Sequence, residues 1–318
     1  MRNRQAITLL FISNIISGFA QGISMIAIPW YFIHDLDQAG LFVRFYLFIT
    51  FLILFWGVYA GTIIDRYSRK KIFIYTNLVC GTIILLISIY GYLFSIVPSY
   101  LILLVFGLTI FNYNIHYPNL YAFGQEITEK KYYGKLNSYI EVQGQSTSVL
   151  AGAFAALLLT GTSNKKMNLA GIPINLPFDI TAWDIHQIFL VDAVTYFLGI
   201  IIISLIRHVS IKKEKIEKGS VLKRFKTGVK YLKDNPIIFN FGLASYMVFA
   251  FLLVEIHILL PSYVHDFLEE GGDIYAAAEV YYSFGAIIAG LIIIKLFRNH
   301  NTVIGVICLM ICVALAFL

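Results

Sequence analysis

The chain has 318 residues, of which 59% are hydrophobic and only 13% carry a charge, and its mean hydropathy is +0.78. These values exclude a soluble domain, because so few polar residues cannot cover the surface of a protein of this size. The formal net charge of +6 does not require nucleic acid as a partner, because the cations follow the topology of a membrane protein. The composition therefore places the chain in a lipid bilayer.

Nine hydrophobic segments have roughly the 20 residues that a helix needs to cross about 30 Å of hydrocarbon. The sequence therefore predicts an all-α, polytopic membrane protein. The first segment lacks a small-residue cleavage site, so we interpret it as a membrane helix and not as a removable signal peptide. The predicted spans are residues 7–33, 41–63, 72–94, 99–121, 137–160, 187–206, 237–261, 275–297 and 303–318.

The positions of the basic residues predict the orientation of these spans. With the N-terminus inside the cell, all of the 24 Lys and Arg residues except Arg44, Lys165 and Lys166 fall in inner segments. Short loops rich in Lys and Arg remain cytoplasmic. We therefore expect a multi-pass protein of the cell (inner or plasma) membrane with a cytoplasmic N-terminus.

Six predicted spans precede the longest basic stretch of the chain, and three follow it. The last span is short and ends without an interfacial residue, so we expect a chain that is truncated after about nine helices. The predicted units are a six-helix transmembrane half (1–207), a cytoplasmic basic linker (208–236) and an incomplete second half of three helices (237–318).

The linker contains apolar residues at helical spacing. Leu222, Phe225, Val229 and Leu232 recur at steps of three and four, with Lys and Arg between them. This pattern predicts an amphipathic helix on the inner membrane surface. A calmodulin-type target helix is the alternative interpretation.

Polar residues inside membrane spans are functional candidates, because lipid cannot satisfy them. In the first span, Asn14, Ser17 and Gln21 recur at three and four residues and share one helix face. We predict that this stripe lines a substrate cavity. Simple hydrogen bonding between helices is the alternative.

A histidine and a carboxylate are predicted at matching depth in two neighbouring spans. Glu141 lies about 8 Å from the inner end of the fifth span, and His116 lies at a similar depth in the antiparallel fourth span. Together they predict a proton-handling pair, in which the carboxylate holds a His that titrates near neutral pH. The alternative is two interfacial side chains that contact headgroups.

Three more carboxylates lie in or near predicted spans. Glu255 lies about 27 Å from the inner end of the seventh span, so we predict a proton or cation site there, with an outer-surface carboxylate as the alternative. Asp192 and Glu279 lie near the start of their spans, and we expect them to cap helices.

Small residues recur at four-residue spacing in two spans, as Gly18-x3-Gly22 and Gly57-x3-Gly61. Such faces allow helices to approach closely inside a membrane. We interpret both as packing faces, and a sliding or gating face is the alternative.

The sequence contains no nucleophile–base set, nucleotide-binding loop or metal-ligand cluster. Cys308 and Cys312 share a helix face, but no His or carboxylate accompanies them, so we expect no metal site there. We therefore predict that the protein is not an enzyme and has no cofactor. Without an ATP-binding motif, any uphill transport has to draw on an ion gradient.

The loop between the second and third spans carries a motif, Gly61-Thr-Ile-Ile-Asp65-Arg66-Tyr-Ser-Arg69-Lys70-Lys71. This G-x3-D-R-x2-R-K pattern resembles the loop between helices 2 and 3 of the major facilitator superfamily. An ordinary positive-inside loop is the alternative, but it accounts only for the cations and not for Gly61 and Asp65.

The resemblance covers the whole chain and includes Asp192-Ala-Val-Thr-Tyr196 and Leu232-Lys-Asp-Asn-Pro236. It is closest to the drug-efflux branch that contains the macrolide and enterobactin exporters. The resemblance implies a helical bundle that exports amphiphilic small molecules, such as drugs, antibiotics or siderophores, by alternating access and with proton antiport. A membrane protein without transport activity, acting as a sensor or a remnant, is the alternative.

The resemblance also implies roles for the residues of the loop. In the family this loop latches the two halves on the cytoplasmic side. Accordingly, Gly61 would permit close helix contact, Asp65 would make the main charged contact, and Arg66, Arg69 and Lys70 would support it. Where the family's antiporter motif has Gly-Pro in the fifth span, this chain has Gly152-Ala153.

Overall fold

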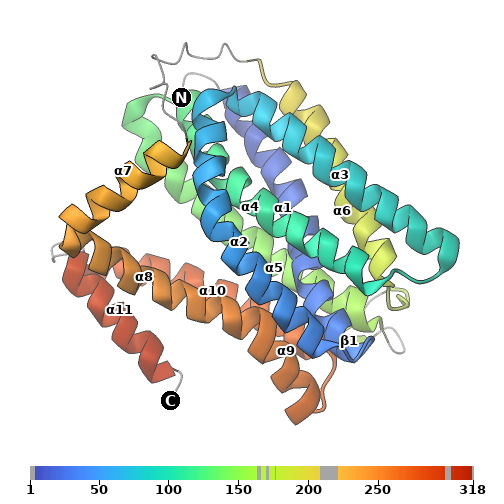
Figure 1. Ribbon diagram of the computed structural model, residues 1–318. Coiled ribbons are helices and arrows are strands. Elements are labelled where there is room, and N and C mark those ends of the chain that lie inside the picture. Colours follow the sequence, from blue (N-terminus) through green and yellow to red (C-terminus); the bar gives the residue numbers. More distant parts are fainter. Residues whose placement is uncertain are drawn as a thin grey trace.

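The computed structural model describes residues 4–162, 166–169, 172–175, 177–207, 221–297 and 302–316, and most of them are helical (Figure 1). The elements in chain order are α1 (Arg4–His34), α2 (Ala39–Arg66), α3 (Arg69–Phe94), α4 (Ser99–Glu126), η1 (Lys130–Tyr132), α5 (Tyr133–Thr160), β1 (Lys166–Leu169), β2 (Ile172–Asn175), α6 (Ile185–Ser204), α7 (Val221–Asp234), α8 (Pro236–Val254), η2 (Glu255–Leu259), α9 (Leu260–Ser262), η3 (Tyr263–Phe267), α10 (Gly272–Phe297) and α11 (Thr302–Ala316).

The predicted fold class is confirmed. Each of the nine predicted spans falls on a helix, and seven helical stretches among the described residues are long and apolar enough to cross a membrane. Six of these stretches belong to α1–α6, and the seventh runs from Ala250 to Phe267. The last helix, α11, has only 15 residues in the described part of the chain.

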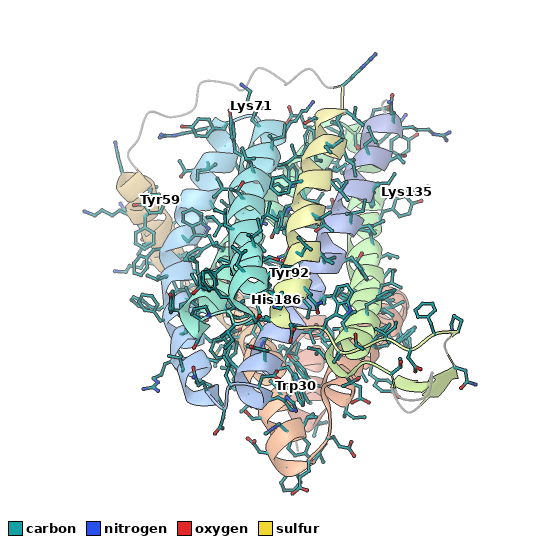
Figure 2. The ribbon with its side chains drawn as sticks, turned by 90° about the vertical axis from the view of Figure 1, so that its right-hand side faces the viewer. Trp30, Tyr59, Lys71, Tyr92, Lys135 and His186 are labelled. Atoms are coloured by element: carbon teal, nitrogen blue, oxygen red, sulfur yellow. The ribbon has the colours of Figure 1, made fainter. Side chains whose placement is uncertain are left out.

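The first six membrane helices form one bundle, and α8, α10 and α11 lie to one side of it (Figure 1). In the bundle, α6 packs against both α1 and α3, while α5 packs against α1 and also against α10. Figure 2 shows Lys71 and Lys135 nearer one end of the bundle and Trp30 toward the other. We call the end with Lys71 and Lys135 the inner end and the end with Trp30 the outer end, after the orientation that the basic residues predict.

The interior of the bundle contains three apolar clusters, and a polar layer lies between the two largest of them. The inner cluster includes Leu10, Phe73, Leu120 and Leu136. The outer cluster includes Phe32, Phe42, Phe106 and Phe189. The buried polar side chains between these clusters include Asn14, Ser17, Asn77, Asn112 and His116.

Two of the predicted helix caps are wrong. Asp184 is the N-cap of α6, where its backbone N–H donates to the Gln187 side chain in a capping box. Asp192 instead lies two turns into α6 and is fully buried. Glu279 likewise lies two turns into α10, which begins at Gly272.

The predicted outer loop contains a short antiparallel hairpin, in which Lys166 of β1 pairs with Asn175 of β2. The predicted linker helix is found as α7. Its Phe225 and Leu232 residues are 43% and 37% exposed, as expected of a helix whose apolar face meets lipid in part. The first part of the predicted linker, residues 208–220, lies outside the described residues.

The two predicted glycine faces have different surroundings. A Cβ atom on Gly22 would lie 2.7 Å from Ala151 Cβ, and one on Gly18 would lie 3.5 Å from Thr147. The Gly18–Gly22 face therefore permits the close packing of α1 on α5. By contrast, a Cβ atom on Gly57 or Gly61 would meet nothing within 4 Å among the described residues.

We expect Gly22→Val to lower the free energy of unfolding by about 1–3 kcal/mol, because the added methyl groups force α1 away from α5. Gly57→Val is the matched control, since it places the same side chain in a helix interior with open space around it. Thermal unfolding of the purified protein in detergent measures both variants. Equal unfolding midpoints for the two variants would contradict this packing role.

Candidate functional site

Arg69, at the start of α3, connects the cationic loop to the inner end of α4. Its Nη1 atom donates to the backbone carbonyl of Ala122 and to Glu126 Oε2, each at 2.9 Å. The side-chain amide of Asn119 donates to the Arg69 carbonyl, also at 2.9 Å. The Glu126 side chain is only 4% exposed, so the two helices share a largely buried ion pair.

Lys70 connects the same loop to the inner end of α6. Its Nζ atom donates to the carbonyl oxygens of Ser204 and Ile206, both at 2.8 Å. The last carbonyls of a helix lack partners within the helix and attract cations. Arg69 and Lys70 therefore stabilise contacts within the first half of the chain.

The other three residues predicted for this motif are exposed. Asp65 and Arg66 lie at the end of α2. The close helix contact predicted at Gly61 is not found among the described residues, because a Cβ atom there would meet open space. Their role in holding the two halves together stays a prediction.

His116 takes part in a chain of polar contacts that crosses three helices. Its Nε2 atom lies 2.6 Å from Asn14 Oδ1, and Asn14 Nδ2 donates to Gln143 Oε1 at 2.6 Å. Gln143 then donates to Thr147 Oγ1 at 3.2 Å. This chain joins α4, α1 and α5 in the polar layer of the bundle.

The structure does not show the predicted contact between His116 and Glu141. The hydrogen-bonded nitrogen of His116 contacts Asn14, whereas the Glu141 carboxylate accepts a hydrogen bond from the Tyr121 hydroxyl. The two side chains have different partners, and the partner of Glu141 on α4 lies five residues beyond His116. Whether either one handles protons stays a prediction.

The polar stripe of α1 is buried against other helices. Asn14 bonds to α4 and α5, as described above, and Ser13 donates to the Gly199 carbonyl of α6 at 3.5 Å. Ser17 lies close to the same glycine, since its Oγ atom would be 3.0 Å from a Cβ there. Gln21 is also buried. These contacts correspond to the alternative of hydrogen bonding between helices.

The contact between α5 and α10 joins the bundle to the helices that follow α7. A Cβ atom on Gly152 would lie 3.0 Å from the Ala276 carbonyl and 3.2 Å from Glu279 Cβ. Glu141 is eleven residues before Gly152, which is close to three full turns of helix, so both lie on the same face of α5. The exposed Glu141 side chain therefore faces the side on which α10 packs.

We call this surface the polar seam, because carboxylates and tyrosines from both sides interact across it. Tyr113 of α4 interacts electrostatically with Glu141 and with Tyr282 of α10. Tyr282 in turn interacts with Glu279 and Glu255, and these two carboxylates interact with each other. The seam consists of Tyr113, Tyr117, Glu141, Glu255, Glu279 and Tyr282.

Glu255 begins η2, a π-helical turn, and a second π-helical turn, η3, follows shortly after it. The wider turns place His257 next to the rings of Tyr46 and Phe106, with centroid distances of 5.7 and 6.3 Å. Such insertions in a helix often occur at functional sites. The predicted candidate Glu255 therefore lies in the seam, where it faces other titratable side chains.

Aromatic rings close the outer end of the seam. Trp30 of α1 stacks on Tyr275 of α10 with ring centroids 5.9 Å apart. The His265 ring of η3 packs edge-on against Trp30 at 6.0 Å and against His34 at 5.6 Å. The Tyr275 hydroxyl also donates to the Ile256 carbonyl at 3.2 Å.

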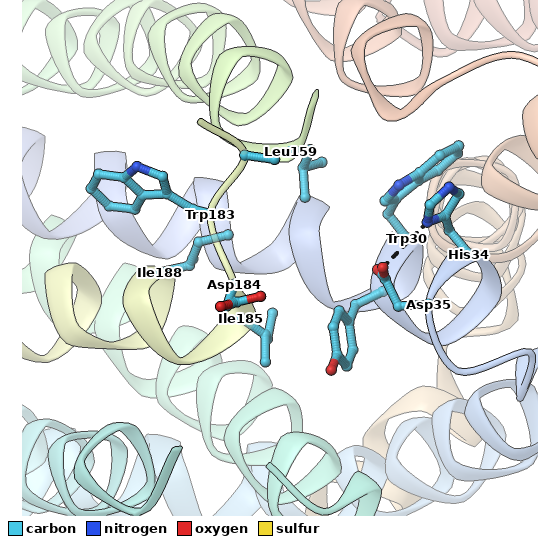
Figure 3. Close-up of a pocket in the computed structure, with 10 residues that line it drawn as sticks. Trp30, His34, Asp35, Leu159, Trp183, Asp184, Ile185 and Ile188 are labelled. Carbon is cyan, nitrogen blue, oxygen red and sulfur yellow. Dashed lines mark hydrogen bonds and ion pairs between the residues drawn. The ribbon is translucent and has the colours of Figure 1, made fainter. Parts of the chain in front are cut away.

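A cavity of about 130 Å³ opens beside this cluster at the outer end of α1 (Figure 3). In it, His34 Nδ1 lies 3.3 Å from Asp35 Oδ1, and Asp184 approaches from the start of α6. The lining residues are Trp30, Tyr31, His34, Asp35, Leu159, Ala182, Trp183, Asp184, Ile185 and Ile188.

Several of these residues were not predicted to be functional. Glu126 is the first of two carboxylates, with Glu129, that follow the predicted fourth span on the side of the cationic loop, and this position was a usable signal. Tyr113, Tyr117 and Tyr121 recur every four residues in the same span, which places them on one face. By contrast, no pattern in the sequence indicates which neighbour that face meets.

Comparison with models of protein families matches residues 10–318 to the family described as Major Facilitator Superfamily. A comparison with curated proteins finds no match. The family match covers nearly the whole chain, including the cationic loop, the polar seam and the outer cavity.

Proposed function

Because the chain belongs to the major facilitator superfamily, we propose that it exports amphiphilic small molecules by alternating access between its two halves. The family match makes it a secondary transporter, and its membrane-capable helices make it an integral membrane protein. Export, the class of substrate, and proton antiport are proposals.

The polar seam is the observation that carries this proposal. It combines three carboxylates with three tyrosine rings and lies where α4 and α5 face η2 and α10. Tyrosine supplies apolar surface together with a hydroxyl, and carboxylates attract a polar or cationic group. Both parts of an amphiphilic molecule find partners on such a surface.

The direction of transport and the N-terminus-inside orientation derive from the sequence. Export follows from the resemblance to the drug-efflux branch, and the basic residues place the N-terminus in the cytoplasm. Proton coupling is supported by the position of Glu141, which is exposed on the seam and bonded to Tyr121. Glu255 lies in the same seam, while His116 is buried in the bundle.

Efflux of amphiphilic dyes from proteoliposomes that contain the purified full chain tests the proposal. We expect dye transport to depend on an imposed proton gradient and to stop when the gradient is collapsed. Folded, correctly inserted protein that moves none of a panel of cationic, neutral and anionic amphiphiles would favour the alternative of a membrane protein without transport activity.

We expect Glu141→Gln to reduce the transport driven by a proton gradient to the level of empty liposomes, because an amide cannot carry the proton. The amide oxygen still accepts the hydrogen bond from Tyr121, so the fold should persist. Glu270→Gln, an exposed change outside the seam, is the matched control. If Glu141→Gln leaves transport driven by the gradient intact, Glu141 is not the coupling carboxyl.

A further inference from the structure

Asp192 is a buried carboxylic acid in the middle of the first half of the chain. Its side chain is fully buried, and its Oδ2 atom accepts a hydrogen bond from Ser24 Oγ at 2.9 Å. Its Oδ1 atom is also buried and has no hydrogen-bond partner among the described residues. The contact joins α6 to α1, and Ser24 is fully buried as well.

The surroundings of Asp192 supply no compensating charge. Among the described residues, the titratable side chains that interact with it electrostatically are Cys80 of α3 and Tyr196 of α6. Neither is a cation, and Ser24 of α1 supplies only a hydroxyl. An ionised carboxylate without a cation or several hydrogen bonds is costly in such a place.

The outer cavity lies at the end of α6 at which the helix begins, and Asp192 lies farther along the same helix. Ile188 lines the cavity and precedes Asp192 by four residues, so both lie on one face of α6, a single turn apart. On α1, Tyr31 lines the cavity and lies two turns from Ser24 on the same face. Along this face of α6, Ile188 is thus the lining residue that comes next to Asp192.

The cavity has the size and polarity to hold water. Its volume of about 130 Å³ exceeds the roughly 30 Å³ that one water molecule occupies in the liquid. His34, Asp35 and Asp184 provide polar groups in its wall (Figure 3). The titratable group of the cavity wall that is nearest along α6 is Asp184, eight residues or about two helical turns before Asp192, with Ile188 midway between them.

We propose that Asp192 is a buried proton-binding site of this protein, and that the outer cavity is the route by which its proton exchanges. The proton resides on the carboxyl group that Ser24 contacts, and Ile188 forms the barrier between this group and the water of the cavity. The site does not depend on the identity of a transported substrate.

Infrared spectroscopy of the full chain reconstituted in lipid tests the proton site. A protonated carboxylic acid has a carbonyl stretch apart from the amide bands, and this stretch shifts in heavy water. We expect wild-type protein to show this band, Asp192→Asn to lose it, and Asp37→Asn, an exposed change at the outer surface, to retain it. A band that is absent from the wild type, or unchanged in Asp192→Asn, overturns the proton site.

Ser24→Ala provides a second readout if Asp192→Asn does not fold. It removes the hydrogen bond from Ser24 and should shift the frequency of the band without abolishing it. An unchanged frequency would assign the band to another carboxyl and overturn the proposal.

The exchange route is tested by the rate at which the band shifts after transfer to heavy water. Ile188→Phe enlarges the barrier and should slow this shift, whereas Ile201→Phe, on the exposed face of the same helix, should not. Equal rates for wild type and Ile188→Phe would overturn the cavity as the route, even if the proton site stands.

Discussion

Arg69→Ala is expected to lower the free energy of unfolding by about 3–5 kcal/mol, which is the usual cost of removing one partner of a buried ion pair. The substitution removes the donor to Glu126 Oε2 and to the Ala122 carbonyl. It thereby removes an ion pair from the Glu126 carboxylate, whose side chain is only 4% exposed. Unfolding of the purified protein in mixed micelles measures the loss.

Lys71→Ala is the matched control, because Lys71 belongs to the same cluster of cations but is exposed. We expect this control to change stability by less than about 0.5 kcal/mol. The double variant Arg69→Ala/Glu126→Ala should lose less than the sum of the two single changes, because each single change already removes the contact between the two side chains. Additive losses, or equal losses for Arg69→Ala and Lys71→Ala, would contradict the ion pair.

The sequence predicts the position of the cationic loop, but it does not predict which carboxylate pairs with Arg69. The motif and its location between two spans were visible, and α2 and α3 do end and begin there. The partner of Arg69 was missed, because Glu126 lies 57 residues away along the chain. Which carboxylate Arg69 reaches depends on how far α4 extends past the predicted end of its span.

His116 and Glu141 show a second limit, which concerns the rotation of each helix about its own axis. The number of residues from the end of a span gives depth directly, at 1.5 Å per residue. Which neighbour a side chain meets depends on how each helix is rotated about its axis. His116 thus contacts Asn14 of α1, while Glu141 contacts Tyr121.

Hydropathy also misplaced two helix starts. The predicted sixth span begins at residue 187, which made Asp192 resemble a residue of the first turn. The signature of a capping box, Asp184 followed three residues later by Gln187, was present in the sequence and marks the true start.

The π-helical turns flank Pro261, which lacks an N–H for the regular helical pattern. A proline predicts such a break but not its type.

Tyr275→Ala is expected to open the outer end of the seam. The ring of Tyr275 is fully buried, stacks on Trp30, and donates to the Ile256 carbonyl. Truncation of a buried aromatic side chain costs about 3–5 kcal/mol. Because the Tyr275 ring joins α10 to α1, its truncation destabilises the state in which the outer end is closed. A shift of about 3 kcal/mol changes the ratio of closed to open molecules by roughly a hundredfold.

Labelling from outside the membrane measures this shift. Ala276 is fully buried beside Tyr275, so a cysteine introduced by Ala276→Cys should be protected from a membrane-impermeant thiol reagent while the outer end is closed. The background carries Cys308→Ser and Cys312→Ser, because both native cysteines are exposed, whereas Cys80 is buried. We expect Tyr275→Ala to accelerate labelling strongly.

Phe284→Ala is the matched control, since it removes an aromatic ring that is 52% exposed on the same helix. It should leave the labelling rate unchanged, because that ring does not cover the outer contact.

Gly272→Ala should act in the same direction as Tyr275→Ala, because a Cβ atom there would lie 2.9 Å from Trp30 Nε1. Equal labelling rates in Tyr275→Ala and the parent would mean that the rings of Trp30 and Tyr275 do not hold the outer end closed. The closure would then rest on the packing of α10 against Gly152 of α5.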